Sequence, residues 1–582
     1  MNTKRALFIT CLSAGMTCLT HAQEAADGFA PEIATGVSSV KMQLADNYMV
    51  AAANPHAANA GLDVLSKGGN AIDAMVATQL VLGLVEPQSS GLGGGAFLVY
   101  YDAKEDLVTT FDGRETAPMA ATPTLFQDEQ GEKLKFWDAV VGGLSVGVPG
   151  TVKLMYETHK KLGVLEWNTL VQPAIELAES GFEVSERLNK LISNDIERLS
   201  VHADTKAYFF SDDGQPHAVG HILKNQAYAD TLKQVASGGA DAFYKGPIAQ
   251  AVVEKVQGAA NPGVLAIADL ANYNIKEREA VCVNYREHDV CGMGPPSSGA
   301  LTVGQILGLL QPYNLAELGA GSAESWRLIG DASRLAFADR ARYMADSDFV
   351  PMPTEGLTSA AYLQERSSLL DGDMALESVS AGEPEWDHAM LLADDESIEF
   401  KSTSHFSIVD ASGNVVSITT TIENGFGSRL MSGGFLLNNE LTDFSFATHN
   451  NGIPIANRVE PGKRPRSSMS PTIVMKEGKP YMVIGSPGGS RIIGYVAKTI
   501  IAHLDWGMDI QEAISMPHAV NRFGTFDLEE GTGATAMQNE LENLGYKVNI
   551  RGLNSGLHGI IIDEGKLMGG ADPRREGVAV GQ

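Results

Sequence analysis

Hydrophobic and polar positions follow a helical period through much of the first half of the chain. The stretch from Asn54 to Leu84 predicts two helices separated by Gly68-Gly69, with Asn70 capping the second and Pro87 ending it. Amphipathic helical patterns also dominate between Trp137 and Asp269. We interpret that region as scaffold.

Strand-like patterns are concentrated near the end of the chain. The runs S-H-F-S-I-V-D (404–410) and V-V-S-I-T-T-T-I (415–422), joined by the polar residues 411–414, predict a hairpin. The runs at 472–476 and 481–485 predict another, and a helical pattern follows a glycine pair. The chain therefore mixes helices with antiparallel strands.

A glycine-rich run, S-G-L-G-G-G, occupies residues 90–95. A phosphate-binding loop would continue into a helix and carry Lys-Ser/Thr, whereas here a strand-like A-F-L-V-Y-Y follows. We expect close backbone packing or a ligand-lining turn instead. The polar, acidic segment 372–401 is predicted to be an exposed loop, and the composition changes sharply at Thr403.

The N-terminus has the layout of a secretory signal. Lys4 and Arg5 precede a mostly apolar stretch, residues 6–19, and Thr20-His21-Ala22 provides a cleavage site. A membrane anchor is the alternative, but the stretch is broken by polar residues and is shorter than the roughly 20 residues that a span needs. We predict a signal peptide over 1–22, a secreted or periplasmic protein and no membrane span in the mature chain.

Composition and charge exclude several classes of protein and of binding partner. With 582 residues, 44% hydrophobic and 20% charged, the chain is globular. The formal net charge is −28, and loss of the two basic residues of the signal would make it −30, which disfavours nucleic acid and anionic lipid. The 13 histidines form no H-E-x-x-H pattern, so neither a metal nor another cofactor is implied.

Two cysteines remain after removal of the signal, Cys282 and Cys291. They bracket Tyr285-Arg286-Glu287-His288, the predicted tip of a hairpin, at equal distances from its midpoint. In an oxidising compartment we expect a disulfide between them; free buried thiols are the alternative.

Thr403 carries the candidate chemistry. A threonine hydroxyl needs a base beside it, and a threonine made N-terminal has one in its own α-amine, whose pKa is roughly 7.7–8.0. The same hydroxyl can free that amine by attacking the carbonyl of Ser402. Spacing alone does not separate Thr403 from any other strand threonine.

The motifs around Thr403 distinguish it from the other strand threonines. K-S-T-S-H-F-S-I-V-D, S-I-T-T-T-I, L-L-N-N-E-L-T-D-F, K-R-P-R-S-S-M-S-P-T and G-S-P-G-G-S-R stand at 401–410, 417–422, 436–444, 463–472 and 485–491. With N-P-H-A-A-N-A-G, G-R-E-T-A-P and P-P-S-S-G earlier in the chain, they resemble the γ-glutamyltranspeptidase family of the N-terminal nucleophile hydrolases. The resemblance implies an α/β fold, a four-layer αββα sandwich. It also implies a precursor cut between Ser402 and Thr403 into a large subunit, 23–402, and a small subunit, 403–582, that form one folded unit.

The resemblance assigns catalytic roles. Thr403 matches the nucleophile, Thr421 the second threonine that assists processing, and Gly488 and Gly489 the oxyanion hole, where only an unobstructed backbone N–H can reach the developing charge. His405 follows the nucleophile by two residues; because the amine suffices as base, we expect a packing or hydrogen-bonding role for it, with general base as the alternative.

It also assigns substrate contacts. A γ-glutamyl group ends in an α-carboxylate and an α-ammonium. Arg114, with the hydroxyls of Ser467 and Ser468, is expected to bind the carboxylate, and Asp443 and Glu440 the ammonium. Glu423 departs from the family, in which many members carry Asn; it is a further carboxylate for the amine or an exposed strand-end charge.

The implied activity is cleavage of glutathione and other γ-glutamyl compounds, with transfer of the glutamyl group to water, an amino acid or a peptide. A glutaryl or cephalosporin acylase of the same fold is the alternative, and an uncut, non-catalytic relative is a further one. Residues 445–462 are shorter than the corresponding segment of members with a lid and lack its Tyr, so we expect an open site that admits larger γ-glutamyl chains.

Overall fold

The computed structural model describes residues 39–397, 399 and 402–582. The predicted signal peptide, 1–22, lies outside the described residues. Within the described part of the chain, no helix is both long and apolar enough to cross a bilayer.

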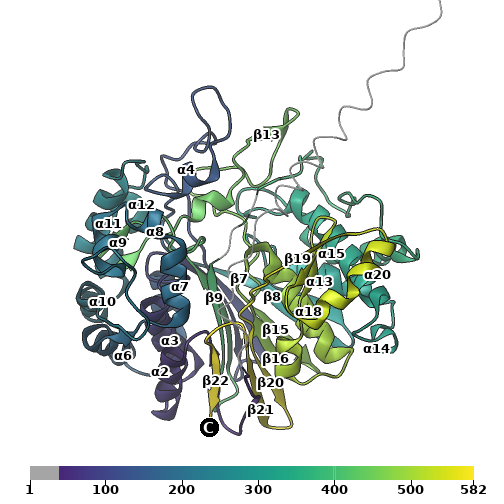
Figure 1. Cartoon of the computed structure of the whole chain (residues 1–582), viewed down its shortest axis with the longest axis horizontal. Helices are drawn as coiled ribbons and strands as arrows, with labels where there is room; N and C mark the ends of the chain where they lie inside the picture. The colour runs from purple at the N-terminus through teal and green to yellow at the C-terminus, as the bar shows by residue number, and fades with distance from the viewer. Residues whose placement is uncertain (1–38, 398, 400–401) are drawn as a thin grey trace, which may run out of the picture.

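Two antiparallel sheets lie face to face at the centre of the molecule (Figure 1). Along the first sheet, the order is β4 (Leu107–Gly113), β3 (Gly95–Asp102), β10 (Val415–Thr421), β9 (Thr403–Val409), β2 (Met49–Ala52) and β22 (Val578–Gly581). Along the second, it is β8 (His288–Met293), β15 (Thr472–Lys476), β16 (Lys479–Gly485), β20 (His558–Asp563), β21 (Lys566–Ala571) and β1 (Gln43–Ala45). The strand β7 (Lys276–Tyr285) joins them, since its start pairs with β4 and its end with β8.

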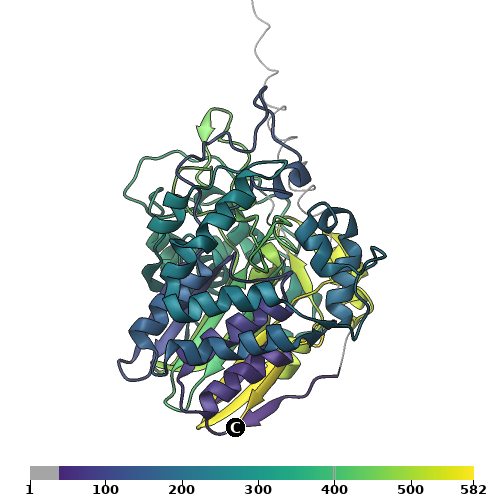
Figure 2. The same ribbon diagram turned by 90° about the vertical axis from the view of Figure 1, so that its left-hand side faces the viewer.

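Helices cover the outer face of each sheet. The first sheet is covered by α2 (Pro55–Ser66) and α3 (Ala71–Val85), with α5 (Thr151–Leu162), α6 (Trp167–Ser180) and α10 (Gln226–Tyr244) packed beyond or beside them. The second is covered by α13 (Gly299–Leu310), α15 (Ala323–Tyr343) and α18 (Ile492–Leu504). Figure 2 views the first group of helices in front of the strands. The predicted αββα sandwich is confirmed.

The strand β3 shows why its sequence is continuously apolar. Ala96, Leu98 and Tyr100 pack in the core beneath the helices of the first sheet, whereas Phe97, Val99 and Tyr101 pack in the core between the two sheets. Because successive side chains of a strand point to opposite faces, a strand buried on both faces has no polar alternation.

The predicted local elements are present. The second predicted helix is α3, and Asn70 caps it by accepting a hydrogen bond from the backbone N–H of Asp73 (3.0 Å). The two hairpins are β9–β10 and β15–β16, followed by α18. The glycine run is a place of close packing, since a Cβ on Gly94 would lie 2.0 Å from the carbonyl oxygen of Thr421.

The hairpin β7–β8 carries the two cysteines. Arg286 and Glu287 form its tip with φ of 50° and 62°, the left-handed backbone that a two-residue turn requires. Cys282 and Cys291 are direct cross-strand partners and are joined by a disulfide in the structure.

The expectation that the acidic segment 372–401 is exposed throughout is wrong for its last part. Leu392, Ala393, Asp395 and Glu399 are buried. The N–H of Ala393 donates to the carbonyl oxygen of Pro454 (3.0 Å), which ties the segment to the loop at 445–462. Its acidic side chains pair with arginines that are distant in the sequence. Composition alone does not reveal such pairs.

Candidate active site

Thr403 and Thr421 meet at one end of the first sheet. Thr403 begins β9, Thr421 ends β10, and the two residues are direct partners across the hairpin. The Thr403 hydroxyl donates to the Thr421 hydroxyl oxygen at 3.4 Å, and the Thr421 hydroxyl donates to the carbonyl oxygen of Ser402 at 2.9 Å. The second threonine therefore links the nucleophile to the carbonyl of the bond that precedes it.

The peptide around that bond is fixed on both sides. The chain is continuous from Ser402 to Thr403. The Ser402 hydroxyl donates to the carbonyl oxygen of Gln88 (2.8 Å), and Arg575 donates to the carbonyl oxygen of Thr403 (3.2 Å). Thr403 is only 4% exposed. Thr403 thus lies in a buried setting in which hydrogen bonds hold the backbone on either side of the bond.

The glycine pair lies where the turn enters α18. Gly488 and Gly489 have φ of 140° and 59°, and a Cβ on Gly488 would lie 2.8 Å from the ring of Tyr495. Gly489 and Ile492 line the same small cavity as Thr403 and Thr421. Glycine has no side chain to shield its backbone N–H group, and N–H groups at the start of a helix favour negative charge.

Arg114 also lines this cavity and is paired with acids. It follows β4, and its guanidinium donates to Glu440 and to Asp443 (2.5 Å). Its remaining bonds go to the backbone carbonyls of Pro465 and Arg466. All three charged side chains are buried. In the uncut chain, Arg114 therefore has no pair of N–H groups free to bind a substrate carboxylate.

Carboxyl groups outnumber cationic groups around Arg114. Burial raises the pKa of Asp443, Glu440 and Glu115, the last to about 8, although Arg114 opposes the rise in each case. Among the described residues, one oxygen of Glu440 and one of Asp443 have no hydrogen-bond donor. The site thus holds buried carboxylate oxygens that a cation with several N–H donors would satisfy.

Glu423 directs its carboxylate into this cluster rather than to solvent. It is buried, accepts a hydrogen bond from the side-chain amide of Asn439, and lines the cavity with Glu440 and Asp443. Its φ of 75° is unusual for a residue with a side chain. The backbone N–H of Glu423 donates to the Thr421 hydroxyl oxygen (2.8 Å), so the turn also orients the second threonine.

Ser467 and Ser468 line the same cavity, and Ser468 already binds a carboxylate. The Ser468 hydroxyl donates to Glu399, three residues before the cut, and accepts from Arg340 (2.8 Å). The Ser467 hydroxyl oxygen accepts from the backbone N–H of Met469 (3.1 Å). The sequence interpretation did not include Glu399 or Arg340; only the arginine-rich run at 463–466 hinted at an anion here.

His405, two residues after Thr403, forms hydrogen bonds with residues other than Thr403. Its ring nitrogens hydrogen-bond with the hydroxyls of Thr419 (2.9 Å) and Ser407 (3.1 Å). Burial, with His558 nearby, lowers its pKa well below the usual value. The geometry supports the packing and hydrogen-bonding role.

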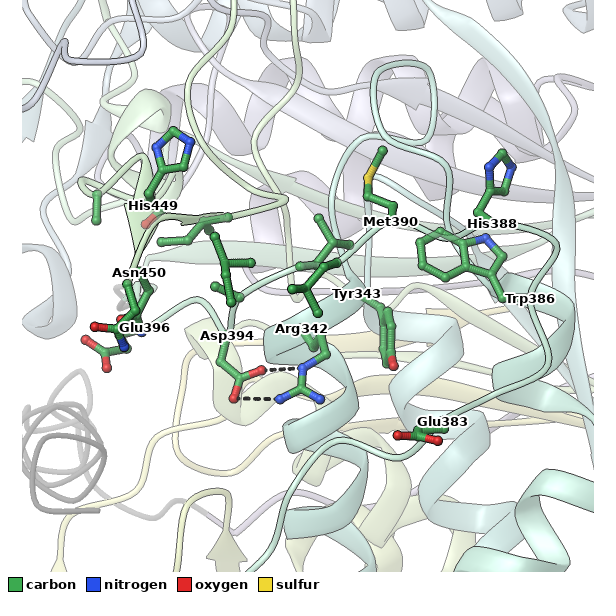
Figure 3. Close-up of a pocket in the computed structure, with 18 of the residues that line it drawn as sticks. Arg342, Tyr343, Glu383, Trp386, His388, Met390, Asp394, Glu396, His449 and Asn450 are labelled. Carbon is green, nitrogen blue, oxygen red and sulfur yellow. Dashed lines mark hydrogen bonds and ion pairs between the residues drawn. The ribbon is translucent and has the colours of Figure 1, made fainter. Parts of the chain in front are cut away.

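The cavity at Thr403 has a volume of about 20 Å³, room for one water molecule, and Glu399 is part of its wall. A much larger groove of about 990 Å³ lies between residues 383–396 and the loop at 445–455 (Figure 3). Arg342 and Asp394 form an ion pair (2.8 Å) in that groove.

A threonine that begins a strand of an αββα sandwich and is linked by hydrogen bonds to the carbonyl of the preceding residue is typical of an N-terminal nucleophile hydrolase. The family model of gamma-glutamyltranspeptidase matches residues 57–582, and the chain belongs to that family.

Known relatives agree with this assignment. The chain is 39% identical to the glutathione hydrolase proenzyme of Bacillus subtilis (strain 168), over 92% of this chain and 91% of that protein. It is 36% identical to the glutathione hydrolase proenzyme of Escherichia coli (strain K12), over 90% of each. Among solved structures, the cephalosporin acylase from Bacillus halodurans superposes with a TM-score of 0.82 at 26% identity, covering 95% of this chain and 99% of that one.

Proposed function

We propose that this chain is a γ-glutamyltransferase and glutathione hydrolase that first cuts itself between Ser402 and Thr403. The observation that carries the proposal is the hydrogen-bonded path from the Thr403 hydroxyl through Thr421 to the carbonyl oxygen of Ser402. It joins the attacking group to the carbonyl under attack.

In the first reaction, the Thr403 oxygen attacks the carbonyl carbon of Ser402, and the bond to the Thr403 nitrogen breaks. The hydroxyl proton passes to the leaving nitrogen. Charge that develops on the carbonyl oxygen is stabilised by the Thr421 hydroxyl, which already donates to it. Water then hydrolyses the ester, leaving a carboxylate on Ser402 and a free amine and hydroxyl on Thr403.

In the second reaction, the freed amine takes the proton of the Thr403 hydroxyl as that oxygen attacks the γ-carbonyl of a γ-glutamyl amide. The amine part of the substrate leaves with a proton, and a γ-glutamyl ester of Thr403 remains. Gly488 and Gly489 stabilise the oxyanion. Water, an amino acid or a peptide then takes the glutamyl group.

Substrate recognition rests on the charges of the cavity. Asp443, Glu440 and Glu423 bind the α-ammonium, because they line the cavity and Arg114 leaves one buried oxygen each of Glu440 and Asp443 without a donor. Arg114 and the hydroxyls of Ser467 and Ser468 complete the site for the α-carboxylate. The acidic cluster favours a γ-glutamyl group over a glutaryl group, which has no ammonium to place there.

The acylase of the same fold stays the second candidate, because a cephalosporin acylase is among the similar structures. We also propose that the mature protein consists of subunits 23–402 and 403–582 and is exported through the signal at 1–22. The loop at 445–462 is proposed to leave the site open to larger γ-glutamyl chains.

The test compares the wild-type protein with Thr403→Ala. Mass spectrometry should find two chains beginning at residues 23 and 403 in the wild type and one uncut chain in the variant. The wild type should release nitroaniline from γ-glutamyl-p-nitroanilide and the variant should not. Full activity while residues 402 and 403 remain linked would contradict the mechanism; preference for glutaryl-p-nitroanilide would favour the acylase.

A further inference from the structure

The freed amine of Thr403 must be neutral if it is to accept the hydroxyl proton. A free α-amine has a pKa of roughly 7.7–8.0, so at neutral pH it is already mostly protonated. Carboxylates close to an amine favour the protonated form further. Four carboxyl side chains line the same cavity as Thr403, those of Glu399, Glu423, Glu440 and Asp443. A base at this position is therefore helped by a positive charge that opposes protonation.

Arg575 contacts the backbone of Thr403 directly. Its Nη1 donates to the carbonyl oxygen of Thr403 at 3.2 Å, and the residue is only 4% exposed. The nitrogen and the carbonyl oxygen of one residue are linked by three covalent bonds and lie no more than about 4 Å apart. The guanidinium therefore comes within about 7 Å of the nitrogen that becomes the amine.

Arg575 lies in the short connection between β21 and β22 and packs against a glycine. A Cβ on Gly556 would lie 2.7 Å from the Nε of Arg575 and 2.7 Å from the ring of Pro487, the residue before Gly488. The φ of Gly556 is 128°, a conformation that favours glycine. Glycine at this position thus allows the Arg575 side chain and the turn that carries the glycine pair to pack against one backbone.

Arg575 belongs to a buried group of charged side chains with Glu86, Arg187 and Glu576. The Nε of Arg187 lies 3.5 Å from the Glu86 carboxylate, and the backbone N–H of Arg187 donates to Glu576 (3.2 Å). Burial raises the pKa of Glu86, although Arg187 and Arg575 oppose the rise. The Ser404 hydroxyl donates to Glu86 (3.0 Å), so the group adjoins the residue after the nucleophile. Loss of Arg575 would leave this group with more acids than cations.

A neighbouring histidine shows that positive charge is disfavoured around Arg575. The pKa of His558 falls to about 4; burial is the largest cause, Asp572 opposes the fall and Arg575 adds to it. Burial also lowers the pKa of His405 well below its usual value. Both histidines are therefore neutral at pH 7 and add no charge beside Thr403. A further cation, the ammonium of cut Thr403, would be disfavoured by Arg575 in the same way.

We propose that Arg575 is a positioning residue for the nucleophile of the cut enzyme. Its guanidinium holds the carbonyl of Thr403 and places a permanent positive charge beside the α-amine, so that the amine stays neutral and accepts the hydroxyl proton as the ester forms. The same proton then passes to the leaving amine of the substrate when its bond to the γ-carbonyl carbon breaks. This inference rests on the proposed function.

The first measurement is the pH dependence of kcat/KM for γ-glutamyl-p-nitroanilide in the cut enzyme. The acid limb of this profile reports the group of the free enzyme that must lose a proton. Arg575→Gln keeps hydrogen-bond donors but removes the charge, and it should move the acid limb up by about one pH unit or more. Arg575→Lys keeps the charge and should move the limb by less than half as much.

Arg327→Gln is the matched control. Arg327 is also a buried arginine that donates to a backbone carbonyl, that of Leu370 (3.0 Å), but it lies in α15. This variant should leave the acid limb where it is in the wild type.

The second measurement titrates the amine without turnover. Acetic anhydride reacts with neutral amines, so the pH dependence of acetylation of the peptide that begins at Thr403, followed by mass spectrometry, gives the pKa of the α-amine. This pKa should rise in Arg575→Gln by the same amount as the acid limb. Only cut molecules yield this peptide, so the measurement also serves a variant that is cut slowly.

An acid limb and an amine pKa that are the same in Arg575→Gln as in the wild type would overturn the proposal. So would equal shifts in the glutamine and lysine variants, or the absence of any cut chain in both, because Arg575 would then serve folding or self-cleavage alone. Failure of the proposed function is a separate result: the cut wild type would not cleave γ-glutamyl-p-nitroanilide, while acetylation of its amine would still report on Arg575.

Discussion

Thr421 stands directly across the hairpin from Thr403 and donates its hydroxyl proton to the carbonyl oxygen of Ser402, 2.9 Å away. The donor is thus already in place at the atom on which negative charge develops when the nucleophile attacks. Gly94 makes this arrangement possible, because a side chain there would collide with the backbone of Thr421.

Removal of this donor should slow self-cleavage. Thr421→Val keeps the shape of the side chain but not the hydroxyl, and loss of one oxyanion donor typically costs about 2.7–4 kcal/mol. We expect cutting to slow about 100- to 1,000-fold, measured as the fraction of two-chain protein against time by mass spectrometry. Thr421→Ser restores the hydroxyl and should cut at close to the wild-type rate. A valine variant that is cut as fast as the wild type would remove Thr421 from the mechanism.

Asp443 should determine whether the enzyme distinguishes donors that carry an α-ammonium from donors that lack one. Asp443→Asn replaces a buried carboxyl group that pairs with Arg114 by a neutral amide. Because charged hydrogen bonds contribute about 1.5–3 kcal/mol, kcat/KM for γ-glutamyl-p-nitroanilide should fall about 10- to 100-fold, while that for glutaryl-p-nitroanilide should not fall.

The control for this change is Asp348→Asn. Asp348 is also an acid paired with an arginine, Arg278, but it is partly exposed. It should leave both substrates unaffected. If Asp443→Asn lowers kcat/KM equally for the two anilides, the residue supports the structure of the site and does not bind the ammonium.

The sequence predicted the elements whose causes are local. Asn70 lies at a helix start, and Arg286-Glu287 lies midway between two cysteines; both patterns are confirmed because capping and tight turns depend on neighbouring residues. Family motifs located Thr403, Thr421 and Gly489, which the fold brings to one cavity, and Gly488 directly precedes Gly489.

The sequence did not predict the electrostatic partners. Glu399 lies 59 positions from Arg340 and 67 from Arg466, and nothing in an acidic run shows which of its carboxylates will be buried. Such pairs depend on the packing of the whole domain. Arg114 shows the same limit of prediction from sequence. Its guanidinium was expected to offer two free donors to a substrate carboxylate, whereas in the structure it is paired with acidic side chains.

The ion pairs of Glu399 should make precursor stability depend on pH. The pKa of Glu399 in the folded chain is about 2, below its ordinary value of 4.5. A depressed carboxyl pKa stabilises the fold above the unfolded-state value, and this contribution is lost as the pH falls from about 4.5 towards 2. In the uncut Thr403→Ala background, the Tm should therefore exceed that of Thr403→Ala/Glu399→Gln at pH 6, and the difference should shrink by pH 3. A difference that is constant between these pH values would contradict the assignment.

The hairpin formed by β13 (His449–Asn450) and β14 (Ile453–Pro454) should determine which donors enter. Its tip, Asn451-Gly452, is a two-residue turn with positive φ, and a Cβ on Gly452 would meet no atom within 4 Å. Because the loop that contains it is short, a chain of three γ-linked glutamates should be cleaved with a kcat/KM within about tenfold of that for γ-glutamyl-p-nitroanilide. Exposed tips tolerate insertion, so six added residues between Asn451 and Gly452 should leave the small donor unaffected and selectively slow the large one. If the parent chain excludes the triglutamate as strongly as a family member with a lid does, the site is closed by something other than this loop.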